Sequence, residues 1–332
     1  MFKYKNIEIP DIVDFEKPVH VENRNFRTKN TDNYFELSSK EAIDFPNKDG
    51  LIVSEDYVNF VDCPVCGSKN NKQLFVKWGF KHSVCMKCDH TYVENQMNTS
   101  KLKELYKNSD IDKQFQLRKK QDNDLNKYWI LLYAKYLKIL QKNSPNNSLL
   151  LDVGAGGGDF LALCDEVTDF ELHAMEFSEN SVEFLETIVG KNNLYREEIS
   201  NTEFNGIQFD IITMFGVLEH INNPVKELKK CKEILSVNGK VLILVPNLYC
   251  RAFKILGINI PTLNPRSHLN YFCKKSMEYL CNEVGLKVAE YYQELPVIDL
   301  MYDFIDYSDK LVDDILDNNE AYYSIYLLGH AD

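Results

Sequence analysis

The sequence predicts an α/β fold, in which a doubly wound and mostly parallel sheet has helices on both faces and a small metal-binding domain precedes it. Three observations lead to this prediction. From residue 149 onward, short apolar runs alternate with helical patterns, as in parallel sheets covered on both faces. A glycine-rich turn, "DVGAGGGDF", follows the first apolar run. Two Cys-x-x-Cys pairs lie upstream, at 63–66 and 85–88.

The alternating segments can be assigned in order. Strands are expected at 149–154, 171–178, 209–216 and 240–247, followed by a final strand pair at 286–295 and 321–332. Helices are expected at 159–167, 179–190, 223–239 and 274–285, and three of them end at a glycine: Gly190, Gly239 and Gly285. In such a sheet, ligands bind at the carboxyl ends of the strands.

Four of the nine cysteines have the spacing C-x2-C-x18-C-x2-C: Cys63, Cys66, Cys85 and Cys88. Two such pairs supply four thiolates that can converge tetrahedrally on one zinc ion, and four protein ligands leave no open position, so we expect structural zinc. His82 or His90 could replace one ligand. The N-terminus has no secretory signal pattern, so we expect a reducing, cytoplasmic compartment without disulfides.

Composition changes divide the chain into four parts. Residues 1–60 are weakly patterned, and we expect an arm of uncertain structure or small β elements packed on the next part. Residues 61–95 form the expected zinc ribbon, and 96–147 form helices that link the ribbon to the catalytic domain and cover a cofactor. Residues 148–332 form the catalytic domain, in which the insert 246–271 is long enough for a substrate lid.

The glycine turn holds a nucleotide-like cofactor, and two cofactors can be tested against it. A dinucleotide fingerprint, G-x-G-x-x-G/A, needs a small residue at its sixth position for close helix–strand packing. Counting from Gly154, that position is Asp159. The turn therefore departs at one position from the fingerprint of a nicotinamide dinucleotide site.

The same turn resembles motif I of the class I S-adenosylmethionine-dependent methyltransferases, an acidic residue, an apolar residue and then GxGxG. Here the matching residues are Asp152, Val153 and 154–158. "FDIITMFGVLEHINNP" and "GKVLILVPN" resemble the family's fourth- and fifth-strand signatures, and "RSHLNYFCKKSMEYLCNEVGLKV" resembles the segment that follows in small-molecule and sugar members. The resemblance covers about 148–293. It implies a Rossmann-like methyltransferase domain with a seven-stranded sheet and S-adenosylmethionine as cofactor.

The resemblance implies roles for the residues around the turn. Glycines let the backbone approach the cofactor because no Cβ intervenes. Glu176 resembles the family's ribose-binding carboxylate, and a carboxylate can accept hydrogen bonds from both ribose hydroxyls. Asp152 could bind the methionine amino group, and an aromatic ring could pack on the cationic sulfonium. The expected cofactor-binding residues are Asp152, Gly154, Ala155, Gly156, Glu176, Phe177, Glu198, Ile199 and Phe215.

An oxygen acceptor must lose its proton near neutral pH, and histidine suits that task. His220 follows the fourth strand in "LEHINNP", and His268 lies in the loop after the fifth strand. A structural role for His220 remains open at this point. Arg251 and Arg266 could hold a phosphate or carboxylate of the substrate, and Tyr271 is a further substrate candidate.

The expected function is methyl transfer to a hydroxyl of a small polar acceptor, such as a sugar, nucleotide-sugar or phosphorylated precursor in surface-polysaccharide or related biosynthesis. The net charge of −12 argues against the alternative of an RNA methyltransferase. Sugar C-methyltransferases resemble the chain but add a C-terminal domain, and a non-catalytic scaffold conflicts with the intact glycine turn. No apolar run approaches the ~18 residues of a membrane span. The sequence leaves the oligomeric state open.

Overall fold

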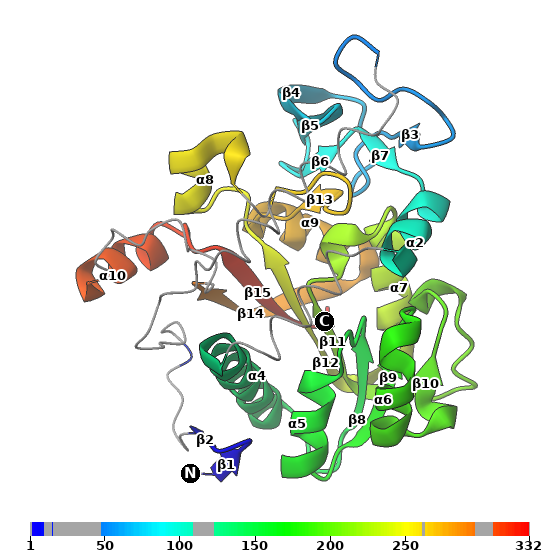
Figure 1. Ribbon diagram of the computed structural model, residues 1–332, viewed down its shortest axis with the longest axis vertical. Helices are drawn as coiled ribbons and strands as arrows, with labels where there is room; N and C mark the ends of the chain where they lie inside the picture. Colours follow the sequence, from blue (N-terminus) through cyan, green and yellow to red (C-terminus); the bar gives the residue numbers. More distant parts are fainter. Residues whose placement is uncertain are drawn as a thin grey trace.

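The structure, a computed structural model, describes residues 2–9, 15, 48–108, 123–260, 263–295 and 308–331. At its centre is a seven-stranded sheet in the order β10-β9-β8-β11-β12-β15-β14 (Figure 1). The bounds are β8 Leu149–Val153, β9 Glu171–Met175, β10 Leu194–Tyr195, β11 Phe209–Phe215, β12 Leu235–Pro246, β14 Leu286–Glu294 and β15 Tyr323–His330.

The strands from β10 to β12 are mutually parallel, whereas β15 is antiparallel to both β12 and β14. The carboxyl ends of β8, β9, β11 and β12 therefore meet at one edge, which is where ligands bind in such folds. The mostly parallel sheet and the Rossmann-like methyltransferase arrangement agree with the sequence-based expectation.

Helices cover both faces of this sheet. Those on one face are α4 Asn123–Asn143, α5 Asp159–Val167 and α6 Glu179–Val189, whose apolar residues share a core with β8 and β9. Those on the other face are α7 Pro224–Ile234 and α9 Lys274–Val284. The further helices of the described residues are α2 Thr99–Asn108, α8 Arg251–Leu256 and α10 Asp309–Asp317.

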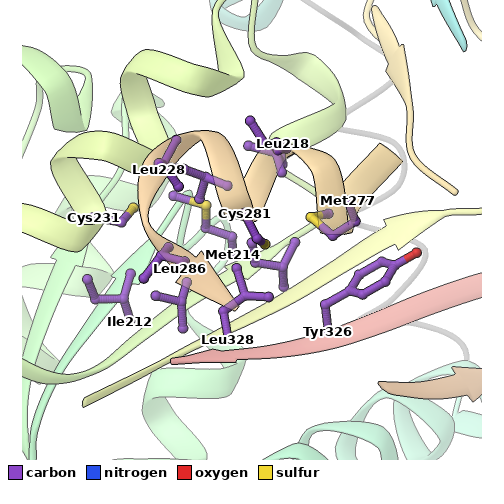
Figure 2. Packing of buried hydrophobic residues seen from close by; sticks show 14 of the residues in the cluster. Ile212, Met214, Leu218, Leu228, Cys231, Met277, Cys281, Leu286, Tyr326 and Leu328 are labelled. Atoms are coloured by element: carbon purple, nitrogen blue, oxygen red, sulfur yellow. The ribbon is translucent and has the colours of Figure 1, made fainter. Parts of the chain in front are cut away.

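Figure 2 shows how the second face is packed. Ile212 and Met214 point to the same side of β11 because strand side chains alternate, and they belong to one buried cluster with Leu228 of α7 and Met277 of α9. Full burial of each such side chain contributes about 1.5–3 kcal/mol relative to exposure. This packing holds the end of β11, which carries a candidate site, against two helices.

One helix boundary in the sequence-based assignment is wrong. The helix predicted at 223–239 ends at Ile234, and the chain continues directly as β12. Leu235 pairs with Phe209 of β11 before an irregularity in the register. A Cβ at Gly239 would lie 2.8 Å from Leu235 Cδ1 and 3.0 Å from the Phe209 carbonyl, so this glycine allows close strand packing and does not end a helix.

The N-terminal hairpin also differs from expectation. Strands β1 Phe2–Tyr4 and β2 Ile7–Ile9 pair with each other, and Tyr4 and Ile9 are buried in the core shared with α4. This hairpin therefore packs on the sheet domain, whereas small β elements were expected on the ribbon. The rest of the arm up to 47, apart from residue 15, lies outside the described residues.

Strands β3 to β7, residues 58–97, form a separate N-terminal β unit, seen at the top of Figure 1. Its bounds are β3 Val58–Phe60, β4 Asn71–Lys77, β5 Phe80–Cys85, β6 Thr91–Val93 and β7 Asn95–Met97. The unit is completed from far along the chain, since β13 Asn270–Tyr271 joins the sheet β13-β6-β5-β4.

The linking helices are partly described. Helix α2 begins at Thr99, and α4 has an apolar stripe whose Leu132, Tyr136 and Ile139 are all buried, which agrees with the helices expected at 96–147. Residues 109–122, which also belong to the helices expected at 96–147, lie outside the described residues. Among the helices in the described part of the chain, none is long and apolar enough to cross a membrane.

Candidate active site and metal centre

The glycine turn follows β8 at the carboxyl edge of the sheet. Gly154 has φ of 71°, and a Cβ there would lie 2.6 Å from Val217 Cγ2. The backbone N–H groups of Gly154 and Ala155 both donate to the Met175 carbonyl at the end of β9, at 2.9 and 3.0 Å. Only glycine fits this position without strain, and the turn is anchored to the neighbouring strand.

Glu176 lies directly after β9 and points to the same turn. Its Oε2 accepts the Gly156 N–H at 2.7 Å, and its Oε1 accepts the N–H groups of Phe177 and Ser178, both at 2.8 Å. Backbone donors thus hold the carboxylate half-buried at the start of α6. Carboxylate oxygens have further lone pairs, so Glu176 can also accept from hydroxyls of a bound ligand.

Asp152 is the last polar residue of β8 and is 3% exposed. Its Oδ1 accepts a hydrogen bond from Thr213 Oγ1 on the adjacent strand at 2.6 Å. Burial raises the pKa of Asp152 to about 7, with a smaller contribution in the same direction from Glu176. The side chain therefore gains or loses a proton near neutral pH, and a cationic ligand group would favour its ionised form.

Helix α2 reaches two of the expected cofactor residues. Lys103 Nζ lies 3.1 Å from Glu198 Oε1 and 5.8 Å from the centre of the Phe177 ring. Ile199 is buried beside Glu198. The structure thus brings α2, Phe177 and Glu198 together next to β9, consistent with helices that cover a cofactor.

Phe215, the last residue of β11, is part of an aromatic group. Its ring centre lies 5.1 Å from that of Tyr136 and 6.0 Å from that of Tyr133 on α4, and 5.0 Å from that of Phe160 on α5. These contacts hold the ring at the carboxyl edge of the sheet, near the glycine turn that precedes α5.

Next to Phe215, three proton-binding side chains meet: Glu219, His220 and His268, called here the acid–base cluster. One ligand atom from each lies within 4.8 Å of the other two. Glu219 Oε1 is 3.8 Å from His220 Nε2, and the two imidazole rings are 4.7 Å apart in an edge-to-face arrangement. Both predicted histidines therefore occupy one site.

The protonation states in this cluster follow from burial. Burial raises the pKa of Glu219 to about 8 and lowers that of His220 to about 4. His220 Nδ1 donates to the Ser267 carbonyl at 2.9 Å, since a carbonyl oxygen can only accept, so Nε2 carries the lone pair. At pH 7 the Glu219 carboxyl is thus protonated and His220 is neutral, with its proton on Nδ1 and its lone pair on Nε2.

The cluster is built by two segments. Glu219 and His220 lie in a 3-10 turn after β11, Leu218–His220, and His268 lies in the loop before β13. The Leu269 N–H donates to the Glu219 carbonyl at 2.7 Å, which joins the segments. Sequence reasoning missed Glu219, although an acidic residue in the apolar stretch "FGVLEH" was a signal for it.

The three substrate candidates occupy different surroundings. Arg251 on α8 forms ion pairs with Asp314, at 2.7 Å, and with Glu320. Arg266 is buried in the turn before His268. Tyr271 is buried on β13, where its hydroxyl is 3.5 Å from His82 Nε2. Residues 261 and 262 of the expected lid lie outside the described residues.

The four predicted metal ligands converge in the N-terminal β unit and are called here the cysteine cluster. All four Sγ atoms lie within 4.8 Å of one another. Cys63 and Cys88 are 3.5 Å apart, and Cys66 and Cys85 are 3.4 Å apart. Four sulfurs at about 2.3 Å from a tetrahedral zinc ion would be about 3.8 Å apart, so the residues fit zinc with small adjustment.

The pKa values of the thiols in the cysteine cluster also favour a bound cation. A hydrogen bond from Cys88 lowers the pKa of Cys63 to about 5, while that bond and burial raise the pKa of Cys88. Burial raises the pKa of Cys66 to about 11. One thiolate is therefore stable here by itself, and further thiolates need a cation beside them. His82 and His90 lie outside the group of four, packed against Phe75 and Phe272.

Comparison with known proteins identifies the family. Two curated relatives, the ubiquinone biosynthesis O-methyltransferases of Glaesserella parasuis and Aromatoleum aromaticum, are each 28% identical to the chain, over 138 and 153 residues. The matches cover 37% and 42% of this chain, and they span only 57% and 64% of the relatives' own lengths.

Solved methyltransferase structures are also similar. A 1,6-didemethyltoxoflavin-N1-methyltransferase from Burkholderia thailandensis, solved with its substrate and S-adenosylhomocysteine, is 13% identical, with a TM-score of 0.48 over 79% of this chain and 100% of that one. An S-adenosylmethionine-dependent methyltransferase from Clostridium acetobutylicum is 13% identical, with a TM-score of 0.43 over 67% and 99%.

The methyltransferase domain family matches residues 125–291, which is half of the chain. The match runs from α4 to β14 and contains the glycine turn, Glu176 and the acid–base cluster. The chain therefore belongs to the methyltransferase domain family.

Proposed function

We propose that the protein transfers a methyl group from S-adenosylmethionine to a hydroxyl of a small polar acceptor, of the class of sugars, nucleotide-sugars or phosphorylated precursors. The acid–base cluster carries this proposal, because a hydroxyl must lose its proton during transfer and the cluster offers a proton acceptor at the carboxyl edge of β11. The curated relatives are themselves named O-methyltransferases.

The residues at the sheet edge fit the cofactor. Gly154 leaves the space that a Cβ would fill, Glu176 offers carboxylate oxygens for the ribose hydroxyls, and Glu198 with Ile199 suits the adenine. Asp152, ionised when an ammonium group lies nearby, suits the methionine part. When bound, the cofactor would supply a methyl group on a cationic sulfur, and the bond from that methyl carbon to sulfur would break to leave a neutral thioether as the acceptor oxygen bonds to the carbon.

The chain's own contribution is to hold the acceptor and take its proton. The acceptor O–H bond breaks as the new O–CH₃ bond forms, and the proton passes to His220 Nε2 or to His268. Glu219 Oε1 lies 3.8 Å from His220 Nε2, so the partial negative charge of this carboxyl oxygen faces the imidazolium that forms. Orientation of the two reactants contributes much of the rate in a displacement of this kind.

We assign structural zinc to the cysteine cluster. Four thiol ligands leave no open coordination position, so the ion would stabilise the N-terminal β unit without taking part in chemistry. Two members, Cys85 and Cys88, are fully buried, which supports a closed site.

Two measurements test the proposal. Calorimetry with S-adenosylmethionine on the zinc-loaded protein should show binding, and absence of binding would contradict the enzyme assignment. A screen of acceptors with labelled cofactor, read by mass spectrometry, should then show label on a sugar hydroxyl. Label on a phenol or catechol would show that the acceptor is aromatic and not a sugar. Label on a carbon or nitrogen atom would reject the proposal that the methyl group goes to a hydroxyl.

A further inference from the structure

One strand belongs to two parts of the molecule. By sequence, β13 lies in the catalytic domain, directly after His268 and Leu269, yet it pairs only with β6 of the N-terminal β unit. The register places Asn270 opposite Tyr92, and the Val93 N–H donates to the Leu269 carbonyl at 2.9 Å. The loop that carries His268 is therefore hydrogen-bonded to the unit that carries the cysteines.

Asn270 extends this connection with its side chain, which is completely buried. Its Nδ2 donates to the Ile221 carbonyl at 2.7 Å, directly after His220. Its Oδ1 is 3.0 Å from His90 Nε2, and because an amide oxygen only accepts, the imidazole donates. One carboxamide thus bridges the segment of His220 and the segment of Cys88.

His90 is part of the second cysteine pair's turn. Its carbonyl accepts the Cys85 N–H at 2.8 Å, and the Cys85 carbonyl accepts the Asp89 N–H at 3.0 Å. The position of the His90 ring therefore depends on how Cys85 and Cys88 are held. The ring is buried and packs on Phe272, so it cannot rotate freely to compensate for a shift.

We propose that Asn270 and His90 are positioning residues that make the geometry of the acid–base cluster depend on metal ligation by the cysteine cluster. The proposal rests on the proposed function, and it gives the N-terminal β unit a role in turnover. His220 directly precedes Ile221, whose carbonyl accepts a hydrogen bond from Asn270. His268 directly precedes Leu269, whose carbonyl accepts one from β6. A displacement of about 1 Å in a reacting geometry costs on the order of 10²-fold in rate.

Substitutions at the bridge test the coupling by activity. Asn270→Ala should lower kcat by about 10- to 100-fold, while the Kd for S-adenosylmethionine stays within about twofold and one zinc per chain is retained. His90→Phe should behave alike, whereas His90→Gln, which keeps a donor, should restore most of kcat. The matched control is Lys81→Met, which breaks an ion pair with Glu94 inside the β unit.

Two further readouts separate positioning from general instability. The pH dependence of kcat should shift in Asn270→Ala and His90→Phe but not in Lys81→Met, compared at matched unfolding temperatures. Zinc removal should lower kcat in the wild type but add less than about twofold in Asn270→Ala. The proposal is overturned if Asn270→Ala keeps kcat within about twofold of the control. It is also overturned if zinc removal lowers kcat by the same factor in Asn270→Ala as in the wild type.

Hydrogen exchange tests the coupling without any acceptor. Zinc removal should speed exchange of the Leu269 amide, which donates to the Glu219 carbonyl, while the Ala162 amide, which donates to the Gly158 carbonyl at 2.8 Å, keeps its protection. Unchanged exchange at Leu269 would overturn the proposal. If the acceptor screen fails, the proposed function fails by itself, and this exchange measurement still decides the coupling.

Discussion

Glu176 Oε2 accepts the backbone N–H of Gly156 at 2.7 Å, so the carboxylate after β9 is bonded to the glycine turn after β8. The two features that the sequence singled out as cofactor ligands are thus one hydrogen-bonded unit. In the proposed function this carboxylate binds the ribose, and its hydrogen bond to Gly156 also keeps the turn in place.

Replacing Glu176 should therefore affect cofactor binding strongly. Glu176→Ala should weaken S-adenosylmethionine binding by about 10- to 100-fold in calorimetry, since charge-assisted hydrogen bonds contribute about 1.5–3 kcal/mol each. The control Glu179→Gln removes a neighbouring exposed carboxylate that pairs with Arg196 and should leave the Kd unchanged. Equal affinity in both variants would reject the ribose role of Glu176.

The contribution of Glu219 to the stability of the protein should fall as pH rises toward 8. Its carboxyl keeps its proton up to about pH 8 in the folded protein but loses it near 4.5 when unfolded. Between these values the folded state binds more protons, so rising pH lowers the free energy of unfolding, by about 1.4 kcal/mol per pH unit.

His220, whose pKa is lowered from 6.5 to about 4 in the folded state, acts in the opposite direction until the unfolded histidine has lost its proton, about one pH unit above 6.5. Asp152 contributes to the same fall until about pH 7. Glu219→Gln should thus flatten the dependence between pH 7 and 8 in urea unfolding, whereas Glu197→Gln, at an exposed side chain, should not. A slope unchanged by Glu219→Gln would show that this carboxyl is ionised at neutral pH.

His268 should be needed for turnover and not for cofactor binding. His268→Ala should lower kcat by about 10²- to 10⁴-fold with the acceptor found by screening, because a proton acceptor is removed. His330→Ala, at the far end of β15 beside Ser236, serves as control and should keep kcat. Near-normal turnover of His268→Ala would leave His220 as the proton acceptor.

Removal of one cysteine ligand should release the metal. Cys63→Ser should reduce bound zinc below one per chain, measured by mass spectrometry, and lower the unfolding temperature, because metal binding stabilises the folded unit. Cys250→Ser removes a buried thiol outside the cysteine cluster and should retain the metal. If Cys63→Ser keeps one zinc per chain, the ligand set is different.

A buried ion pair joins α4 to the end of β14. Lys135 Nζ lies 2.9 Å from Glu294 Oε2, and the two side chains are 2% and 0% exposed. Lys135→Met leaves a buried carboxylate without this partner and should lower the free energy of unfolding by about 3–5 kcal/mol. Lys142→Met, which breaks the exposed pair with Glu290, should cost at most about 1 kcal/mol. Equal losses would contradict this comparison.

The order of strands and helices was predictable because their signals are local. Short apolar runs between helical patterns predicted the positions of β8, β9 and β11. The two Cys-x-x-Cys pairs predicted the members of the cysteine cluster. The end of α7 was misplaced, because the pairing of Leu235 with β11 outweighs the helical pattern and Gly239. Sequence-local rules do not contain that pairing, since Phe209 lies far upstream.

The sequence by itself indicated the family and predicted the cofactor, since short motifs encode the glycine turn, which lets a backbone approach a ligand, and the carboxylate of Glu176. Only the tertiary structure decided which side chains act together. It placed Glu219 with His220 and His268, gave Arg251 two carboxylate partners, and joined β13 to the cysteine-bearing unit. These depend on contacts between distant segments, and burial sets the pKa values only once those contacts have formed.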